Sequence, residues 1–251
     1  MNYKNLGTPH KTDSLALYNC DCMELLKQTP DNYYDICVVD PPYGINRDGG
    51  ETGKNWKVYE KKGWDTKPPS EEYFIELFRV SKNQVIWGAN YFTEHLPASM
   101  GWIMWDKGQK LTMSDGELAF TSFERALRIK VLNRCTIGEK GGNLHPTQKP
   151  VKLYDWIFEN YAEKGMKVLD THLGSMSSVI AAINAGMHIT GCELDEDYYN
   201  DGIERVTRHL DQGVFQFSEN PTPASCDMTD KDISDYQYDL LPSLNQTNGK
   251  A

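Results

Sequence analysis

The stretch KVLDTHLGSMSSVIAAINAGMHITGCEL, residues 167–194, decides the fold. It contains a short apolar run that ends in Asp170, a turn of small residues, a helical segment that ends at a glycine, and a second apolar run that ends in Glu193. A strand, a helix and a strand in so short a span are typical of two parallel strands joined by a crossover helix. The stretch therefore predicts an α/β protein with a parallel sheet.

The same alternation of short apolar runs and amphipathic segments continues on both sides. Strands are expected at 15–21, 35–40, 83–89, 101–107, 167–173 and 188–194, and helices at 22–28, 70–81, 150–165, 175–186 and 195–210. The runs at 117–123 and 126–132 are also strand-like, and we predict that they form an antiparallel pair. The expected fold class is therefore α/β, with a mainly parallel sheet and an antiparallel hairpin.

The chain is acidic, and part of its acidity is concentrated near the carboxyl terminus. The 251 residues carry a net charge of −10, and the segment 218–251 has six acidic residues against two lysines. Because this segment is polar, contains prolines and lacks periodicity, we predict a flexible acidic tail after a single domain at 1–217. The net charge disfavours a nucleic-acid binder that depends on bulk electrostatics, so such binding would require a local basic surface.

The sequence shows no sign of a membrane anchor or a metal site. No apolar run approaches the roughly 18 residues of a membrane span, and the first residues lack the apolar core of a signal peptide. The six cysteines form no CxxC pair, and several lie in strand-like runs where free cysteine acts as a small hydrophobe. We expect a cytoplasmic protein with reduced thiols and neither metal nor membrane contact.

The tetrapeptide Asp40-Pro41-Pro42-Tyr43 directly follows a predicted buried strand. It therefore lies at the carboxyl end of that strand, where open α/β sheets bind their ligands. The aspartate and the carbonyls of the prolyl segment are hydrogen-bond acceptors, and the tyrosine ring offers a flat face for stacking. This combination suits an amino group on a planar ring. The alternative is a strand that simply ends in a Pro-Pro turn.

Residues 170–178, DTHLGSMSS, form a small-residue turn between a strand and a helix. Such a turn lets a ligand approach the helix amino terminus. Glu193 follows Asp170 by 23 residues and ends the next strand, which is the position of the acidic residue that binds ribose hydroxyls in related folds. Of the GxGxxG pattern only Gly174 remains, so the strand–helix–strand–Glu context is the stronger indication. The alternative is an ordinary crossover with serine N-caps.

The segment 145–150, HPTQKP, precedes the predicted helix at 150–165. Its two prolines bracket a rigid turn that carries a cation and several hydrogen-bond donors. Taken alone, the hexapeptide is compatible with a plain helix entry, with Pro150 near the first helical position.

The order of these three motifs resembles the amino-group DNA methyltransferases of the permuted "beta" type, in which the catalytic tetrapeptide precedes the methyl-donor loop. The resemblance extends from about residue 15 to 210 and includes the segments 18–26, 87–92 and 105–107. It implies a circularly permuted, Rossmann-like fold that uses S-adenosylmethionine. Enzymes that methylate protein glutamine or ribosomal RNA can carry a similar tetrapeptide, but after the donor loop. The order found here therefore favours DNA as substrate.

The resemblance also assigns roles to individual residues. Asp40, Pro41, Pro42 and Tyr43 would be catalytic: the target base is flipped out of double-stranded DNA, Tyr43 stacks on it, and Asp40 and the Pro41 carbonyl accept its amino hydrogens. Residues of the other motifs would bind S-adenosylmethionine, namely Asp21, Cys22, His145, Thr147, Gln148, Lys149, Asp170, Leu173, Gly174, Ser175, Glu193 and Leu194.

An aspartate at the first position of the tetrapeptide is similar to the adenine N6 enzymes, whereas cytosine N4 enzymes of this type more often carry serine there. We therefore expect adenine N6 as target, with cytosine N4 as the alternative. An RNA methyltransferase and a catalytically impaired DNA-binding homologue also stay open, the latter because the donor loop departs from the family pattern at Thr171, His172 and Met176. A methionine in place of a glycine requires a different backbone path or crowds the donor. An isolated histidine there is more often structural than a base.

Two basic segments, at about 44–67 and 107–142, are predicted insertions for DNA recognition. They combine cations with aromatic residues, which suits phosphate contacts and base stacking. The expected nucleic-acid contacts are Arg47, Lys54, Lys57, Lys61, Lys62, Lys107 and Arg128. A solvated basic face is the alternative for most of them individually. The sequence leaves a homodimer open.

Overall fold

In the computed structural model, residues 3–50, 58–108, 114–133 and 144–216 are described. The chain divides after Gln212 into a large unit, Met1–Gln212, and a second unit, Gly213–Ala251. Apart from the last turn of one helix, the second unit lies outside the described residues, and so does the predicted acidic tail. The fold and the site belong to the large unit.

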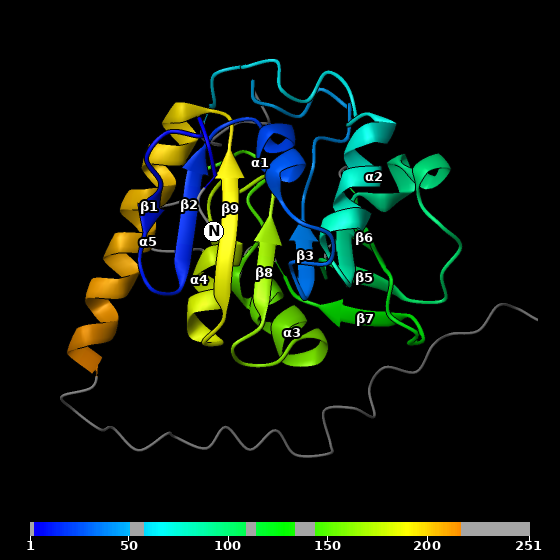
Figure 1. The fold of residues 1–251 in the computed structure, drawn as a ribbon. Helices are drawn as coiled ribbons and strands as arrows, with labels where there is room; N and C mark the ends of the chain where they lie inside the picture. Colours follow the sequence, from blue (N-terminus) through cyan, green and yellow to red (C-terminus); the bar gives the residue numbers. More distant parts are fainter. Residues whose placement is uncertain (1–2, 51–57, 109–113, 134–143, 217–251) are drawn as a thin grey trace, which may run out of the picture. The chain divides into compact units, whose positions relative to one another are not determined.

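The large unit is built on a mixed sheet whose nine described strands have the order β1-β2-β9-β8-β3-β4-β6-β5-β7 (Figure 1). The strands are β1 (His10–Lys11), β2 (Leu15–Asn19), β3 (Ile36–Val39), β4 (Gln84–Trp87), β5 (Trp102–Asp106), β6 (Gly116–Thr121), β7 (Arg128–Val131), β8 (Lys167–Asp170) and β9 (His188–Glu193). The central run β2-β9-β8-β3-β4 is parallel throughout. This confirms the α/β fold with a mainly parallel sheet that the sequence predicts.

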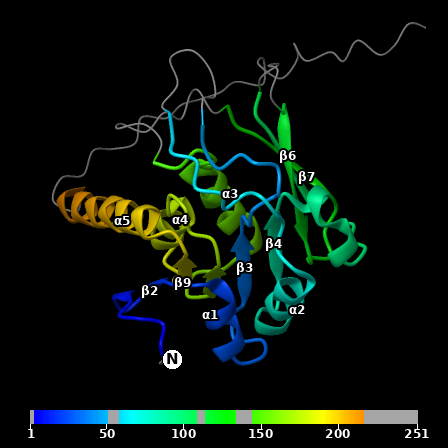
Figure 2. The same ribbon diagram turned by 90° about the horizontal axis from the view of Figure 1, so that it is seen from above.

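Helices cover both faces of the sheet (Figure 2). They are α1 (Cys22–Gln28), α2 (Glu71–Val80), α3 (Val151–Tyr161), α4 (Ser177–Asn184) and α5 (Glu196–Gln216). Helices α1 and α2 pack on one face, where Leu25, Phe74 and Leu77 join the core around β3 and β4. Helices α3, α4 and α5 cover the opposite face, where Ile157 and Val206 join the second core cluster. The apolar spacing of each helix, i to i+3 or i+4, is what directs one side of it to the sheet.

The antiparallel hairpin of the sheet differs from the predicted one. We expected the run at 126–132 to pair with 117–123, but β7 pairs in parallel with β5, and β6 pairs antiparallel with both β5 and β4. The hairpin is therefore β5–β6. Because β6 inserts between β4 and β5, both of its edges are occupied, and the following strand pairs with the free edge of β5.

The topology gathers the predicted motifs at one edge of the sheet. Parallel strands β2, β9, β8 and β3 have their carboxyl ends on the same side. From β3 the chain crosses through α2 to β4, and from β8 it crosses through α4 in the other direction to β9. The neighbours β3 and β8 thus form a topological switch point, which is where open α/β sheets bind ligands. Asp40 and Asp170 stand at these two strand ends.

No helix among the described residues has the length and apolar character needed to cross a membrane.

Candidate active site

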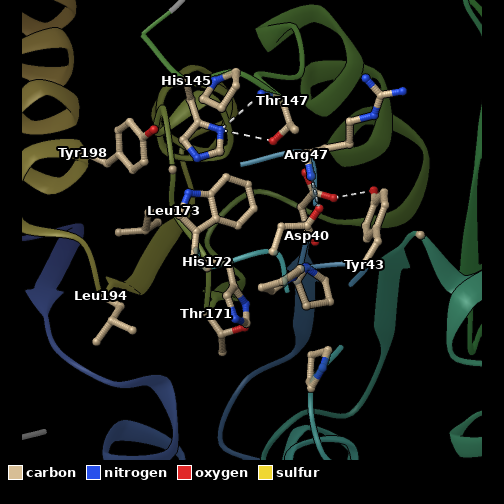
Figure 3. A pocket seen from close by; sticks show the side chains of 18 of the residues that line it. Asp40, Tyr43, Arg47, His145, Thr147, Thr171, His172, Leu173, Leu194 and Tyr198 are labelled. Carbon is tan, nitrogen blue, oxygen red and sulfur yellow. Dashed lines mark hydrogen bonds between the residues drawn. The ribbon is translucent and has the colours of Figure 1, made fainter. Parts of the chain in front are cut away.

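A cavity of about 1440 Å³ opens at this edge of the sheet. Its walls include residues of all three sequence motifs, together with parts of the segment 58–69 and of the β5–β6 hairpin. Figure 3 shows Asp40 and Tyr43 on one side of it and Tyr198 and Leu194 on the other. Sites for one drug-sized ligand usually measure about 300–1,000 Å³, so this cavity has room for a small ligand and part of a second one.

We call the part around Asp40 the target half, after the role in binding the target base that the family resemblance gives to Asp40; its residues are Asp40, Tyr43, Lys107, Glu117 and Lys149. Asp40 Oδ1 accepts a hydrogen bond of 2.6 Å from the Tyr43 hydroxyl, and Asp40 Oδ2 accepts one of 2.5 Å from Lys149 Nζ. Lys149 also contacts Glu117 Oε2 at 3.0 Å, and Lys107 contacts Glu117 Oε1 at 2.8 Å. Two carboxylates and two ammonium groups therefore neutralise one another in a largely buried network.

The charges of this network shift the pKa of its members in different directions. Burial alone would raise the pKa of Glu117, but Lys149 and Lys107 lower it to about 2. Burial raises the pKa of Asp40 in spite of Lys149, because the Glu117 carboxylate adds to the effect. Burial would lower the pKa of Lys149, yet Asp40 and Glu117 outweigh it and raise that pKa. Glu117 is therefore the more firmly ionised of the two carboxylates.

The Tyr43 ring is held face to face with another tyrosine. It stacks on Tyr91, which follows β4 in the short helix η1 (Ala89–Tyr91), with ring centroids 5.2 Å apart and planes 18° apart. Gly88 lies under the ring: it has φ of +68°, and an added Cβ would lie 2.1 Å from Tyr43 Cε1. Any larger residue at position 88 would displace the aromatic ring of the tetrapeptide.

We call the part of the cavity that the family resemblance assigns to the methyl donor the donor half: it is lined by Asp21, Gly174, Glu193 and Leu194, and the buried Asp170 stands at the end of β8 without lining it. Asp170 accepts hydrogen bonds from Ser178 Oγ at 2.5 Å and from the His172 amide at 3.0 Å. Burial raises its pKa to about 7 against these two hydrogen bonds, and the charges of Asp40 and Glu193 contribute to the rise. A buried carboxyl with such a pKa is ready to ionise when a cation binds beside it.

Among the described residues, backbone amides hold the carboxylate of Glu193. Its Oε2 accepts from the Gly174 amide at 2.8 Å, and its Oε1 accepts from the Asp195 amide at 2.9 Å. Each carboxylate oxygen keeps a second lone pair, so hydroxyl groups of a ligand can still donate to it. Asp21 caps α1 by accepting from the Met23 amide at 2.8 Å. Leu194 beside Glu193 is 69% exposed and presents an apolar side chain to the cavity.

Met176 explains how the altered turn fits. It adopts φ of +58° and ψ of +30°, the left-handed conformation that a glycine takes without strain. Its side chain is fully buried and packs against Gly202 in α5, where an added Cβ would lie 2.7 Å from Met176 Cγ. It does not line the cavity. The methionine therefore keeps the backbone path of a glycine and does not crowd this half of the cavity.

His172 is tied into the wall of the site. Its Nδ1 lies 2.9 Å from Thr171 Oγ1, which in turn lies 2.8 Å from the Tyr73 hydroxyl. Burial lowers the pKa of His172 to about 4, so the ring is neutral near pH 7. These contacts favour the structural role expected for an isolated histidine in this turn.

The residues of the segment 144–150 have two different settings: some hold the turn itself, and Lys149 contacts Asp40. His145 packs between Tyr198 and Trp64, at centroid distances of 4.4 and 5.1 Å, and Thr147 Oγ1 lies 3.1 Å from its Nδ1. Gln148 is buried and accepts from the Leu144 amide at 2.9 Å, so its side chain holds the turn. Lys149 lies in the target half, on Asp40, although the family resemblance placed it near the donor. Of the other expected donor residues, Leu173 is largely buried, and Cys22 and Ser175 line the cavity with it.

The residues expected to contact DNA differ in how far their side chains are exposed to solvent. Arg47, Lys61 and Arg128 are exposed. Lys62 is largely buried in ion pairs of 2.7 Å with both Asp195 and Asp197, and Lys107 is buried against Glu117. These two lysines therefore have settings different from the exposed basic surface that the sequence predicts. Lys54 and Lys57 lie outside the described residues.

Sequence reasoning did not single out Glu117 as functional. Glu117 begins a predicted strand, and an acidic residue in such a run was a weak signal. Nothing in the chain order links it to Asp40, because the two are brought together only by the insertion of β6 beside β4.

Solved structures with the same fold place this architecture among the methyltransferases. The structure of the M1.HpyAVI–SAM complex matches with a TM-score of 0.53 and 19% identity over 76% of this chain and 99% of that chain. PvuII DNA methyltransferase, which is cytosine-N4-specific, matches with a TM-score of 0.55 and 14% identity over 83% of this chain and 96% of that one. At these identities the likeness establishes the fold.

The sequence comparisons find similar proteins among the DNA methylases. A model of the DNA methylase family, N6_N4_Mtase, matches residues 86–204. The chain is 27% identical to the putative methylase YubD of Escherichia coli over 77% of this chain and 92% of that protein. It is 23% identical to the type II methyltransferase M.HpaI of Haemophilus parainfluenzae over 74% of this chain and 72% of that one. By these comparisons the chain is similar to the amino-group DNA methylases, the family of N6 and N4 enzymes.

Proposed function

We propose that the protein transfers the methyl group of S-adenosylmethionine to the exocyclic amino group of a base in double-stranded DNA, with adenine N6 as the target. One observation carries the proposal: Asp40 and Glu193 line one cavity at the strand ends of β3 and β9, and the buried Asp170 stands at the end of β8 between them. A hydrogen-bond acceptor for an amino group thus faces an acidic pocket suited to a cationic nucleoside.

The residues of the donor half fit S-adenosylmethionine. Glu193 keeps lone pairs for ribose hydroxyls, and the buried Asp170 carboxyl can ionise beside a positive charge. Leu194 and Cys22 give an apolar wall for a purine, and Asp21 is an acceptor for its amino group. When bound, S-adenosylmethionine supplies an electrophilic methyl group on its sulfonium. The M1.HpyAVI structure with SAM has the same fold and agrees with this assignment.

The residues of the target half would orient the base. A base must leave the duplex before its amino group can be reached. Asp40 and the Pro41 carbonyl then accept the two amino hydrogens, which directs the nitrogen lone pair away from them and toward the donor. Tyr43 stacks on the ring. Most of the rate enhancement comes from this orientation, and the Asp40 charge stabilises the nitrogen as it becomes positive.

The choice of adenine rests on the family pattern at one residue. Aspartate at position 40 resembles the adenine enzymes, whereas serine is more usual in the cytosine N4 enzymes of this type. Cytosine N4 is the second candidate, because PvuII DNA methyltransferase has the same fold and is cytosine-specific. The arrangement of acceptors in the target half suits either amino group.

For the DNA, the exposed cations Arg47, Lys61 and Arg128 are the proposed phosphate contacts. Arg47 also lines the mouth of the cavity, where a flipped nucleotide would enter. The two recognition insertions, the circular permutation and the acidic tail stay predictions of the same proposal.

The test is incubation of the purified protein with unmethylated genomic DNA and isotopically labelled S-adenosylmethionine, followed by mass spectrometry of the nucleosides. We expect label on adenine N6. The variant Asp40→Ala should lose about 100-fold or more of the transfer rate, as when a preorganised polar group is removed from an active site, while its Kd for the donor changes little. The exposed Asp201→Asn variant in α5 is the control.

The other outcomes are equally informative. Label on cytosine N4 would retain the mechanism and replace the target base. Donor binding without label on DNA would overturn the DNA substrate and lead to competition experiments with RNA. Full activity of Asp40→Ala would show that Asp40 is not the acceptor.

A further inference from the structure

Both oxygens of Asp40 are occupied by groups of the protein itself. Oδ1 accepts from the Tyr43 hydroxyl at 2.6 Å, and Oδ2 accepts from Lys149 Nζ at 2.5 Å. The proposed function, on which this inference rests, requires Asp40 to accept a hydrogen from the amino group of the target base. Each oxygen keeps one further lone pair, so an amino hydrogen can bind to Asp40 either beside these two donors or in the place of one of them.

A second carboxylate lies within reach of both donors. Glu117 Oε2 is 3.0 Å from Lys149 Nζ and 3.3 Å from the Tyr43 hydroxyl oxygen. Its other oxygen, Oε1, is held by Lys107 at 2.8 Å. Glu117 is thus anchored at one oxygen, and its second oxygen points to the two groups that now occupy Asp40. Lys149 is only 3% exposed, so its ammonium group cannot withdraw into water.

We propose that Glu117 is a positioning residue that takes over the Lys149 ammonium group when the target base binds, and so frees Asp40 Oδ2 to accept the amino hydrogen. In the free protein Lys149 occupies the place of the amino group. On base binding, its contact with Glu117 shortens as its contact with Asp40 lengthens.

The charges of the target half keep the free-energy cost of this exchange small. Lys149 already contacts both carboxylates, so no ion is left unpaired and no proton has to move. Leaving a buried charge without a partner is what makes such rearrangements unfavourable. The pKa of Glu117 is lowered to about 2, which keeps it ionised as the receiving group, whereas the pKa of Asp40 is raised. Lys107 keeps Glu117 in place during the exchange.

The experiment compares charge with shape at position 117. Glu117→Gln keeps the size of the side chain and removes the charge, whereas Glu117→Asp keeps the charge and shortens the side chain. We measure the single-turnover rate on unmethylated genomic DNA with saturating labelled S-adenosylmethionine, the Kd for the donor, the apparent Kd for the DNA and the thermal midpoint. Glu159→Gln, an exposed glutamate in α3, is the matched control.

We expect Glu117→Gln to lower the single-turnover rate by about 10- to 100-fold while both Kd values change less than about threefold, because Lys149 then stays on Asp40. Glu117→Asp should retain more activity than Glu117→Gln. A structural role predicts the reverse order, since the isosteric glutamine preserves packing better than the shorter aspartate. If the glutamine variant does not fold, the pair Glu117→Asp and Glu117→Asn, equal in size and different in charge, provides the same comparison.

The outcomes separate this inference from the proposed function. If the wild-type protein does not methylate DNA, the proposed function fails and the role of Glu117 in it fails too. If the wild type is active and Glu117→Gln is equally active, or more active than Glu117→Asp, only the positioning role is overturned. A fall in the rate that is matched by weaker donor binding and a lower thermal midpoint would also overturn it, in favour of a structural role.

Discussion

At the ends of β3 and β6, Asp40 and Glu117 are paired with Lys149 and Lys107 at distances of 2.5 to 3.0 Å. At the ends of β8 and β9, Asp170 and Glu193 have neutral hydrogen-bond partners among the described residues: a serine hydroxyl and backbone amides. The target half of the cavity is therefore electrically balanced, whereas the donor half carries carboxyl groups that burial pushes toward the protonated form.

The difference shows how each half is prepared for its ligand. A balanced network is stable without a ligand, and in the exchange proposed above its contacts rearrange when an uncharged base binds to Asp40. An acidic pocket without a ligand has a less favourable electrostatic free energy, because its buried carboxyl groups lack a countercharge. A bound cation supplies this charge and stabilises the ionised form. We infer that the donor half is preformed for a positively charged ligand and that the target half rearranges.

The largest expected effect tests the balance of the target half. Lys149→Met removes one ammonium group and leaves Asp40 and Glu117 with Lys107 alone, so the free energy of unfolding should fall by about 3–5 kcal/mol. Urea denaturation at pH 7 measures it. Lys152→Met, at an exposed position in the first turn of α3, is the control and should change stability by less than about 0.5 kcal/mol. A loss below about 1 kcal/mol for Lys149→Met would show that the network does not depend on its charge balance.

The same kind of change in the donor half should have a smaller and different effect. Asp170→Asn keeps the shape of the side chain and its hydrogen bond from the His172 amide, while Ser178 can turn to accept from the new amide. Because burial already raises the pKa of Asp170 to about 7, removing its charge should not lower stability by more than about 1 kcal/mol.

Donor binding, by contrast, should weaken by about tenfold in Asp170→Asn, because the buried carboxylate no longer attracts the positive charge of the ligand, and a tenfold change in Kd corresponds to about 1.4 kcal/mol. Isothermal titration calorimetry with S-adenosylmethionine measures it, with Asp201→Asn as control. If Asp170→Asn lost stability as Lys149→Met does, the two halves would not differ in the way that their contacts indicate.

The sequence predicts those features of the two halves that depend on which residue follows each strand. Asp40, Asp170 and Glu193 each follow an apolar run, and parallel strands bring the carboxyl ends of such runs to one edge. That reasoning located the two halves of the cavity and identified the elements around them. For Met176 it led us to expect a crowded donor or a different backbone path, whereas this residue adopts the left-handed conformation open to a glycine and does not line the cavity.

What could not be predicted depends on contacts between distant segments. Lys149 meets Asp40 across 109 residues, and its position follows from how α3 packs, not from the HPTQKP motif. Glu117 reaches the site because β6 inserts between β4 and β5, which is also why the expected pairing of 126–132 was wrong. Lys62 and Lys107 look like surface cations in the sequence, since nothing local reveals Asp195 or Glu117 as their partners.

The smallest expected effect is a pH dependence of donor affinity that only the donor half should show. The pKa of Asp170 in the free protein is raised to about 7, chiefly by burial, with Asp40 and Glu193 adding to the rise. Below pH 7 this carboxyl is mostly protonated, and a cationic ligand must expel the proton to gain the charge interaction. Affinity for S-adenosylmethionine should therefore increase several-fold from pH 6 to pH 8 and level off above that, since one pKa unit corresponds to about 1.4 kcal/mol. His172, whose pKa is lowered to about 4, stays neutral over this range and does not contribute.

Calorimetry at pH 6, 7 and 8 in two buffers of different ionisation enthalpy should show proton release at the lower pH values, and Asp170→Asn should flatten the profile. S-adenosylhomocysteine, which lacks the sulfonium charge, should show a weaker dependence. A slope that persists in Asp170→Asn would assign the titration to another group, such as Asp40 or Glu193, whose pKa values burial also raises, and would remove Asp170 from the preformed part of the site.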